Sequence, residues 1–210
     1  MPDSEVIKMN HAEVFDRAIS ILKSGGLIAL PTDTVYGLAA DPWNGEAISQ
    51  LFKVKSRSEL ESIPVLLRGV AAIDEIAMDV PGRVRTIAEK FWPGPLTIVV
   101  RRKSDLPSEI SATDTIGVRA PDHEFAMALL KMYGPIAATS ANLSGQPAAT
   151  SAEQVASSLS GMIDLIVDGG KSAGGVSSTV VDFTANPPVL LREGPISLES
   201  VLRVWENYRG

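Results

Sequence analysis

Four cationic side chains stand at the ends of apolar segments, where they could bind a negatively charged ligand. Lys55 and Arg57 follow an amphipathic segment at about residues 46–54. Arginine offers phosphate oxygens a planar fork and lysine a mobile point charge, so the pair could clamp a phosphate. Cations at a helix end can also complement the helix dipole on a solvated face, and both interpretations stay open. Arg119 and Arg192 each end an apolar segment, and Arg119 needs a carboxylate partner, either in the protein or in a ligand.

Hydroxyl and amide side chains gather in segments that follow short apolar runs. Residues 31–38 read PTDTVYGL and residues 139–145 read TSANLSG. The first segment could bind a ligand or form a helix cap or Asx turn, and the second could bind a nucleotide or form a simple turn. Residues 168–179 are glycine-rich, which suits close approach of the backbone to a ligand but also a mobile loop. Because open α/β sheets bind ligands where their strands end, these segments form the candidate site.

Several mechanisms are excluded by what the sequence lacks. It has neither the GxxxxGK[ST] loop of Walker-type NTPases nor a GxGxxG dinucleotide fingerprint. The absence of cysteine excludes disulfides and thiolate chemistry. Its two histidines, His11 and His123, support neither a serine–histidine hydrolase nor a zinc site, and we expect His123 to cap a helix or face solvent. No metal-ligating residues are predicted. The arginines, the lysine and the hydroxyls therefore predict anion binding without a covalent nucleophile.

Alternating apolar and amphipathic segments must position these residues. We expect short strands near residues 27–30, 65–67, 96–100, 116–118, 136–138, 165–167, 179–183 and 189–191, with helices between most of them. This alternation predicts the α/β class, with a sheet surrounded by helices. The last three strands have no helix between them, which predicts antiparallel pairs there and hence a mixed sheet. Asn10 and Glu13 resemble a capping box, and Trp92–Thr97 is expected to form a turn fixed against the core.

Composition bounds the class of protein. The chain has 210 residues, of which 45% are hydrophobic and 21% charged, and we expect one domain over residues 1–210. The net charge of −6 argues against a generally basic protein that coats nucleic acid, although it allows a local basic cleft. We see neither a signal peptide nor an apolar run long enough for a membrane helix. These features predict a cytoplasmic protein without a membrane partner.

Seven sequence blocks occur in one order and resemble the signature blocks of the YrdC/TsaC family of threonylcarbamoyl-AMP synthases. Any one block is weakly specific, but seven in register, over about residues 12–205, are strongly specific. The blocks are PTDTVYGL (31–38), KSR (55–57), WPGPLT (92–97), VRAP (118–121), SANLSG (140–145), STVV (178–181) and LREG (191–194). The resemblance is to the single-domain type of the family.

The resemblance implies a YrdC-like fold, a twisted mixed sheet with a concave central cavity, and a nucleotidyltransferase that joins L-threonine, bicarbonate and ATP. Mg²⁺ is expected to arrive with ATP, with no tightly bound metal held by the protein. Downstream, the product would serve the tRNA threonylcarbamoyl transferase machinery. Carried over by position, the residues around threonine are Thr34, Arg119, Ala138 and Ser178, with Tyr36 and Arg68 as further candidates. The residues around ATP are Lys55, Arg57, Thr115, Ser140, Asn142, Ala148 and Arg192, of which Lys55 and Arg57 would position the phosphates.

Two positions depart from the family pattern, and two other functions stay open. The family often has Asn before the proline at Pro64 and His four residues after it, where this chain has Ile63 and Arg68. Residues 58–68 therefore form a variant segment. One other function is an RNA-binding or ribosome-maturation module that would bind RNA weakly in the same cavity. Another is a related enzyme that forms a carbamoyl-adenylate from carbamoyl phosphate, which the absence of cysteine disfavours.

Overall fold

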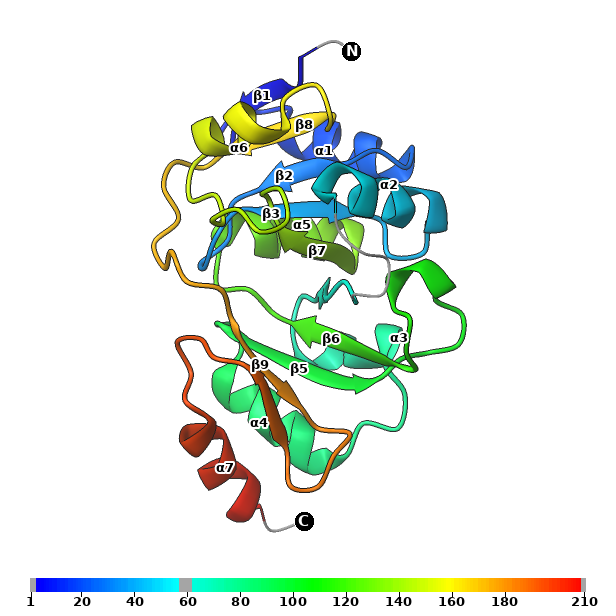
Figure 1. Ribbon diagram of the computed structural model, residues 1–210, viewed down its shortest axis with the longest axis vertical. Coiled ribbons are helices and arrows are strands. Elements are labelled where there is room, and N and C mark those ends of the chain that lie inside the picture. Colours follow the sequence, from blue (N-terminus) through cyan, green and yellow to red (C-terminus); the bar gives the residue numbers. More distant parts are fainter. Residues whose placement is uncertain (1–2, 57–61, 209–210) are drawn as a thin grey trace.

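The computed structural model describes residues 3–56 and 62–208, which fold into a mixed sheet with helices on its faces (Figure 1). The described strands follow the order β1-β8-β2-β3-β7-β4-β6-β5-β9-β10 in one sheet. Both parallel and antiparallel pairs occur, so the predicted α/β class and mixed sheet are confirmed. The strands are β1 (Glu5–Lys8), β2 (Ile28–Leu30), β3 (Gly37–Ala40), β4 (Val65–Leu66), β5 (Leu96–Arg101), β6 (Thr115–Arg119), β7 (Ile136–Ser140), β8 (Leu165–Asp168), β9 (Thr179–Asp182) and β10 (Val189–Arg192).

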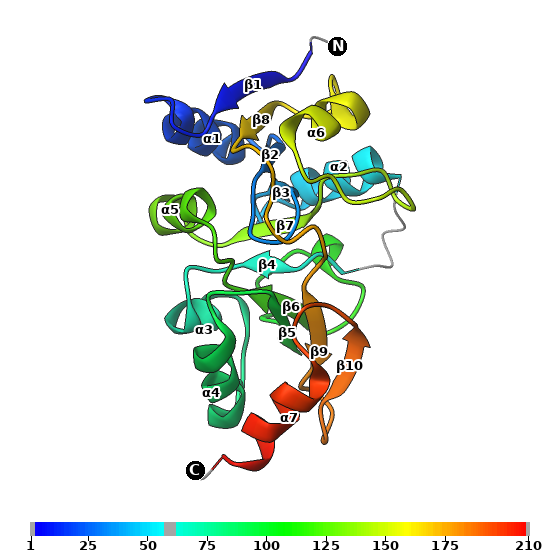
Figure 2. The same cartoon turned by 90° about the vertical axis from the view of Figure 1, so that its left-hand side faces the viewer.

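Helices cover the sheet on both sides. Figure 2 shows α1 and α5 on one side of the strands near the N-terminus and α2 and α6 on the other. Near the C-terminus, α4 and α7 pack against each other. The α-helices are α1 (Val14–Lys23), α2 (Gly45–Lys55), α3 (Ile73–Ile76), α4 (Gly82–Phe91), α5 (Glu124–Tyr133), α6 (Ala152–Leu159) and α7 (Leu198–Glu206), and Val70–Ala72 and Ser108–Ile110 are short 3₁₀ turns. No helix in the described part of the chain is long and apolar enough to cross a membrane.

Capping residues fix where the helices begin. The side chain of Asn44 accepts a hydrogen bond from the amide of Ala47 and starts α2, and Ser151 caps α6 in the same way. The expected capping box at Asn10 is wrong, because α1 begins after Glu13, which makes no side-chain cap bond. With Asn44 as its cap, α2 runs from Gly45 to Lys55. Its last residue, Lys55, lies at the end of β7, where it contacts Ser140.

The pairing of the last strands differs in part from expectation. β9 and β10 are antiparallel, as predicted. β8, however, lies between β1 and β2 and pairs with both of them in parallel. The chain after β8 therefore leaves one end of the sheet and joins the other end, where β9 pairs with β5 in parallel. This crossing brings residues 169–178 past the strands that bear the candidate site (Figure 1).

Candidate functional site

A pocket of about 360 Å³ lies over one face of the central strands. Side chains alternate between the two faces of a strand, so Thr97 and Val99 of β5 line the pocket while Ile98 lies in the hydrophobic core. On β6, Gly117 and Arg119 line the same pocket. Thr115 and Arg119 are four residues apart on β6, which separates them by about 13 Å. The pocket therefore extends along the whole length of β6.

Hydroxyls and arginines give the pocket its chemistry. Asp33 lies behind Arg119, but none of the described residues that line the pocket is acidic. The lining therefore carries positive charge in a chain whose net charge is −6. Its polar side chains are Thr32, Thr34, Tyr36, Ser62, Thr97, Thr115, Arg119, Thr139, Ser140, Ser177, Ser178 and Arg192.

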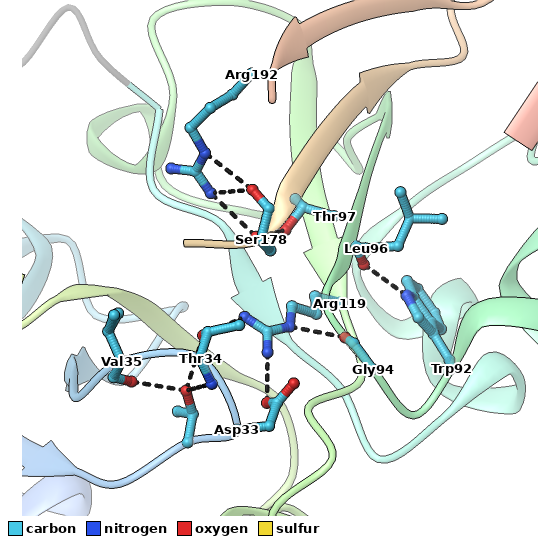
Figure 3. Close-up of polar contacts among 11 residues, drawn as sticks. Asp33, Thr34, Val35, Trp92, Gly94, Leu96, Thr97, Arg119, Ser178 and Arg192 are labelled. Atoms are coloured by element: carbon cyan, nitrogen blue, oxygen red, sulfur yellow. Dashed lines mark hydrogen bonds and ion pairs between the residues drawn. The ribbon is translucent and has the colours of Figure 1, made fainter. Parts of the chain in front are cut away.

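Arg119 is held in place by three groups (Figure 3). Its Nε donates to the carbonyl oxygen of Gly94 at 2.9 Å, Nη1 to the hydroxyl of Thr34 at 3.0 Å, and Nη2 to Oδ1 of Asp33. These bonds use three of the five N–H groups of an arginine side chain. Burial lowers the pKa of the guanidinium, and the Asp33 carboxylate opposes that shift. Of the two partners that the sequence left open, the structure supplies the protein carboxylate.

The hydroxyl of Thr34 has a defined hydrogen-bonding direction. Thr32 Oγ1 donates to the carbonyl oxygen of Val35 at 2.7 Å, which uses its only proton. The 3.0 Å contact between the hydroxyls of Thr32 and Thr34 must then carry the proton of Thr34. Because Thr34 also accepts from Arg119, its oxygen has one acceptor site left for a ligand.

A second arginine site lies across the pocket at Ser178. Nε and Nη2 of Arg192 both donate to the carbonyl oxygen of Ser178, at 3.0 and 2.8 Å, and Nη2 also donates to its hydroxyl at 3.0 Å (Figure 3). The hydroxyls of Ser178 and Thr97 are 2.8 Å apart. Besides burial, the positive charge of Arg192 also lowers the pKa of Arg119, so the two cations repel each other. A ligand with negative charge between them would relieve that repulsion.

Comparison with known proteins identifies the family. The model of the Sua5/YciO/YrdC family, described as "Telomere recombination", matches residues 20–194. This chain belongs to that family. It is 40% identical over 194 residues to the threonylcarbamoyl-AMP synthase of Pyrococcus abyssi, covering 91% of this chain and 57% of the relative. The threonylcarbamoyl-AMP synthase of Bacillus subtilis is 39% identical over 188 residues, covering 88% of this chain and 54% of that protein. This chain thus spans about half the length of these two curated relatives.

A solved structure of the same family supports the fold. The P. abyssi Sua5 complexed with L-threonine superposes with a TM-score of 0.90 and 38% sequence identity, covering 95% of this chain and 60% of that one. The YrdC-like fold that the sequence implied, a mixed sheet with helices around it, is therefore confirmed.

The structure gathers most, but not all, of the predicted site residues of this family member. Arg57 lies outside the described residues. Lys55, Arg68, Asn142 and Ala148 are described but do not line the pocket. The predicted residues that do line it are Thr34, Tyr36, Thr115, Arg119, Ala138, Ser140, Ser178 and Arg192.

Lys55 is an internal cation that orders the loop after β7. Only 2% of it is exposed, so the solvated-face interpretation is wrong for this residue. Its Nζ donates to the carbonyl oxygens of Ser140 and Asn142, at 2.5 and 2.8 Å, and its own carbonyl accepts from the amide of Ser144. The side-chain amide of Asn142 donates to the carbonyls of Leu143 and Gln146, which closes the same loop. Lys55 and Asn142 thus shape the backbone that carries Ser140 to the pocket.

Tyr36 and Arg68, the two further residues predicted to bind the threonine substrate, form hydrogen bonds with other parts of the protein. The phenol of Tyr36 donates to the carbonyl of Gly170 at 2.7 Å and accepts from the amide of Gly169. Burial raises its pKa, so it stays a neutral hydroxyl that holds the glycine-rich loop. Arg68 lies at the surface, where its guanidinium pairs with Glu75. The structure therefore does not bring Arg68 to the pocket.

Two polar residues that line the pocket, Thr97 and Ser62, lie outside the segments that the sequence predicted to form the site. Thr97 lies where the predicted turn at 92–97 and the predicted strand at 96–100 overlap. The period-two alternation of β5 was the signal that could have placed its hydroxyl in the pocket, where it bonds with Ser178. Ser62 lies in the variant segment and carries no motif. His123 stands at the N-cap of α5 but makes no side-chain cap bond, and its Nδ1 is buried without a partner. The expected side-chain cap is therefore wrong, and that nitrogen does not face solvent. The turn at Trp92 does pack against the core, with its indole bonded to the carbonyl of Leu96.

Proposed function

We propose that this chain makes threonylcarbamoyl-AMP and pyrophosphate from L-threonine, bicarbonate and ATP, for the threonylcarbamoyl modification of adenosine in tRNA. Relatives at 39–40% identity carry that activity in their names, and the P. abyssi Sua5 has been solved with L-threonine. The observation that carries the proposal is the pocket itself. It holds two arginines and many hydroxyls but, among the described lining residues, no acid. Carbamate, amino-acid carboxylate and triphosphate are all anions that such a lining suits.

Threonine binds at the Arg119 end of the pocket in this proposal. The N–H groups of Arg119 that remain after its bonds to Gly94, Thr34 and Asp33 donate to the threonine carboxylate. The remaining acceptor site of Thr34 takes an N–H of the substrate amine. Ser178, fixed by Arg192 and Thr97, supplies a hydroxyl on the opposite side. These contacts orient the amine toward the centre of the pocket.

Two steps then lead to the product. The neutral amine of threonine reacts with bicarbonate to give N-carboxythreonine and water. A carboxylate oxygen of that carbamate attacks the α-phosphorus of ATP, the bond from this phosphorus to the bridging oxygen breaks, and pyrophosphate leaves with the electron pair. Among the described residues that line the pocket there is no cysteine, and no histidine, lysine or carboxylate that would activate a hydroxyl as a covalent nucleophile. Its contribution is alignment of two anions in line and stabilisation of the charge that forms on the phosphoryl oxygens.

The nucleotide occupies the other end of the pocket, beside Thr115 and Ser140, with Arg192 near the phosphates. Magnesium enters as part of the substrate MgATP. In the described ranges, no group of three or more His, Cys, Asp or Glu could hold a metal ion, so phosphate oxygens and water supply its ligands.

Incubation of the purified protein with MgATP, L-threonine and bicarbonate tests the proposal, with the product identified by its mass. Threonylcarbamoyl-AMP is the expected product. A reaction that instead requires carbamoyl phosphate would assign the chain to the carbamoyl-adenylate chemistry. Salt-dependent binding of RNA with no adenylate product would favour the RNA-binding module.

A further inference from the structure

Among the described residues that line the pocket, Ser62 has a buried hydroxyl without a hydrogen-bond partner. Ser62 lines the pocket, and its Oγ is shielded from solvent without a donor or acceptor in reach. Buried polar side chains almost always have a partner in folded proteins, so an exception calls for an explanation. The neighbouring Ile63 is fully buried in the core. The alternation of side chains thus turns residue 63 inward and leaves residue 62 as the one that faces the pocket.

Neighbouring strands place Ser62 among other hydroxyls. Pro64 lies between β7 and β6, because its carbonyl accepts from the amide of Ala138 and a Cβ on Gly117 would lie 3.4 Å from its ring. Ser62 comes two residues before Pro64. Ser140 follows Ala138 by two residues, and Thr115 precedes Gly117 by two. All three of these hydroxyl residues line the same pocket. They form the hydroxyl end of the pocket, away from Arg119.

We infer that Ser62 is a further ligand of the nucleotide, donating its hydroxyl proton to an oxygen of the phosphate chain. The inference deepens the proposed function and rests on it for the identity of the ligand. Rotation about the Cα–Cβ bond of Ser62 to another staggered rotamer turns its Oγ, which is shielded from solvent in the free protein, into the pocket that the residue lines, where the hydroxyl can donate to an acceptor of the ligand. With no acid among the described lining residues, the acceptors that such a pocket admits are those of an anionic ligand, and the phosphates are the ones at this end. Thr115 and Ser140 flank the same anion.

The unpaired hydroxyl gives Ser62 a distinctive signature. In the free protein, its burial without a partner costs stability, and that cost disappears when the ligand supplies the acceptor. Replacing Ser62 by Ala should therefore leave the free protein equally stable or raise its Tm, while it weakens binding of the nucleotide. A residue with only a structural role would lower stability and affinity together.

Isothermal titration of MgATP against three variants tests this directly. Ser62→Ala should weaken MgATP binding about tenfold or more, the effect of losing one hydrogen bond to a charged group. Ser62→Thr keeps the hydroxyl and should bind within about threefold of the wild type, a small fraction of the free energy of that bond. Ser172→Ala is the matched control, because Ser172 also has a buried, unpartnered Oγ but does not line the pocket. It should leave MgATP binding unchanged.

Each outcome counts for or against Ser62. Unchanged MgATP affinity in Ser62→Ala, a loss of L-threonine affinity instead, or a lowered Tm would overturn the inference. Wild-type protein that binds no MgATP would overturn both the inference and the proposed function. If the wild type binds MgATP, Ser62→Ala weakens that binding, and no threonylcarbamoyl-AMP forms, then the proposed function fails while the phosphate contact of Ser62 stands.

Discussion

Arg119 and Asp33 form a buried ion pair at the wall of the pocket, with 7% and 15% of their side chains exposed. Removing one partner of such a pair leaves an uncompensated charge inside the protein. Asp33→Ala should therefore lower the free energy of unfolding by about 3 kcal/mol, measured by chemical denaturation. The pair of Arg68 with Glu75 is far more exposed and serves as the control. Glu75→Ala should change stability by less than about 1 kcal/mol. Equal effects of the two variants would show that burial of the Arg119 pair has no energetic consequence.

Arg119→Lys should impair the use of threonine more than the use of ATP. Lysine keeps the charge but lacks the planar fork that bonds Gly94, Thr34 and Asp33 at once. Steady-state kinetics should show a KM for threonine that rises by about tenfold or more, the effect of one lost charge-assisted bond, with a smaller change in the KM for ATP. Thr34→Val, which removes a hydroxyl at nearly constant shape, should act in the same direction. A loss of ATP binding with threonine affinity intact would mean that the two substrates are placed the wrong way round.

Replacing Lys55 by alanine should have a different effect from replacing Arg57 by alanine. Lys55→Ala removes the donor to the carbonyls of Ser140 and Asn142, so it should lower both Tm and turnover. The prediction for Arg57 comes from the sequence alone. Loss of its phosphate bonds should reduce kcat/KM for ATP by about 10- to 100-fold with little change in Tm. Normal ATP kinetics in both variants would remove these two residues from the account of the phosphates.

His123 should make stability fall in mildly acidic solution. Burial lowers its pKa below the ordinary 6.5, so the unfolded chain binds a proton more readily than the folded one. The contribution of His123 is then fully present above about pH 6.5 and is lost as the pH falls through its lower folded pKa. Denaturation at pH 7.5 and 5.5 should show a smaller loss for His123→Gln than for the wild type. His11→Gln is the control, and an equal change in both variants would exclude His123 as the source.

Much of the fold follows from local pattern, but the order of the strands does not. Apolar runs such as those of β5 and β6 are β-branched and easily read. β3 was not predicted, because Gly37–Ala40 is short, contains no β-branched residue and follows a polar turn. β1 was missed because most of it is exposed at the edge of the sheet. The place of β8 between β1 and β2 depends on packing over more than 130 residues, which no local pattern encodes.

The site was predictable where residues follow strands and carry a motif. Arg119, Ser178 and Arg192 line one pocket because neighbouring strands of the sheet carry them there, and their types already indicated anion binding. The direction of a long side chain was not predictable. Lys55 could reach a ligand or the protein, and its contacts with Asn142, across 87 residues of sequence, decide for the protein. Ser62 has no recognisable motif, and only its missing hydrogen bond draws notice.

The most direct test of the central claim is the release of pyrophosphate from MgATP, measured with each substrate omitted in turn. The mechanism requires that threonine and bicarbonate combine before the α-phosphorus is attacked. Pyrophosphate should therefore appear only when L-threonine and bicarbonate are both present. Release at the same rate without threonine would contradict the account.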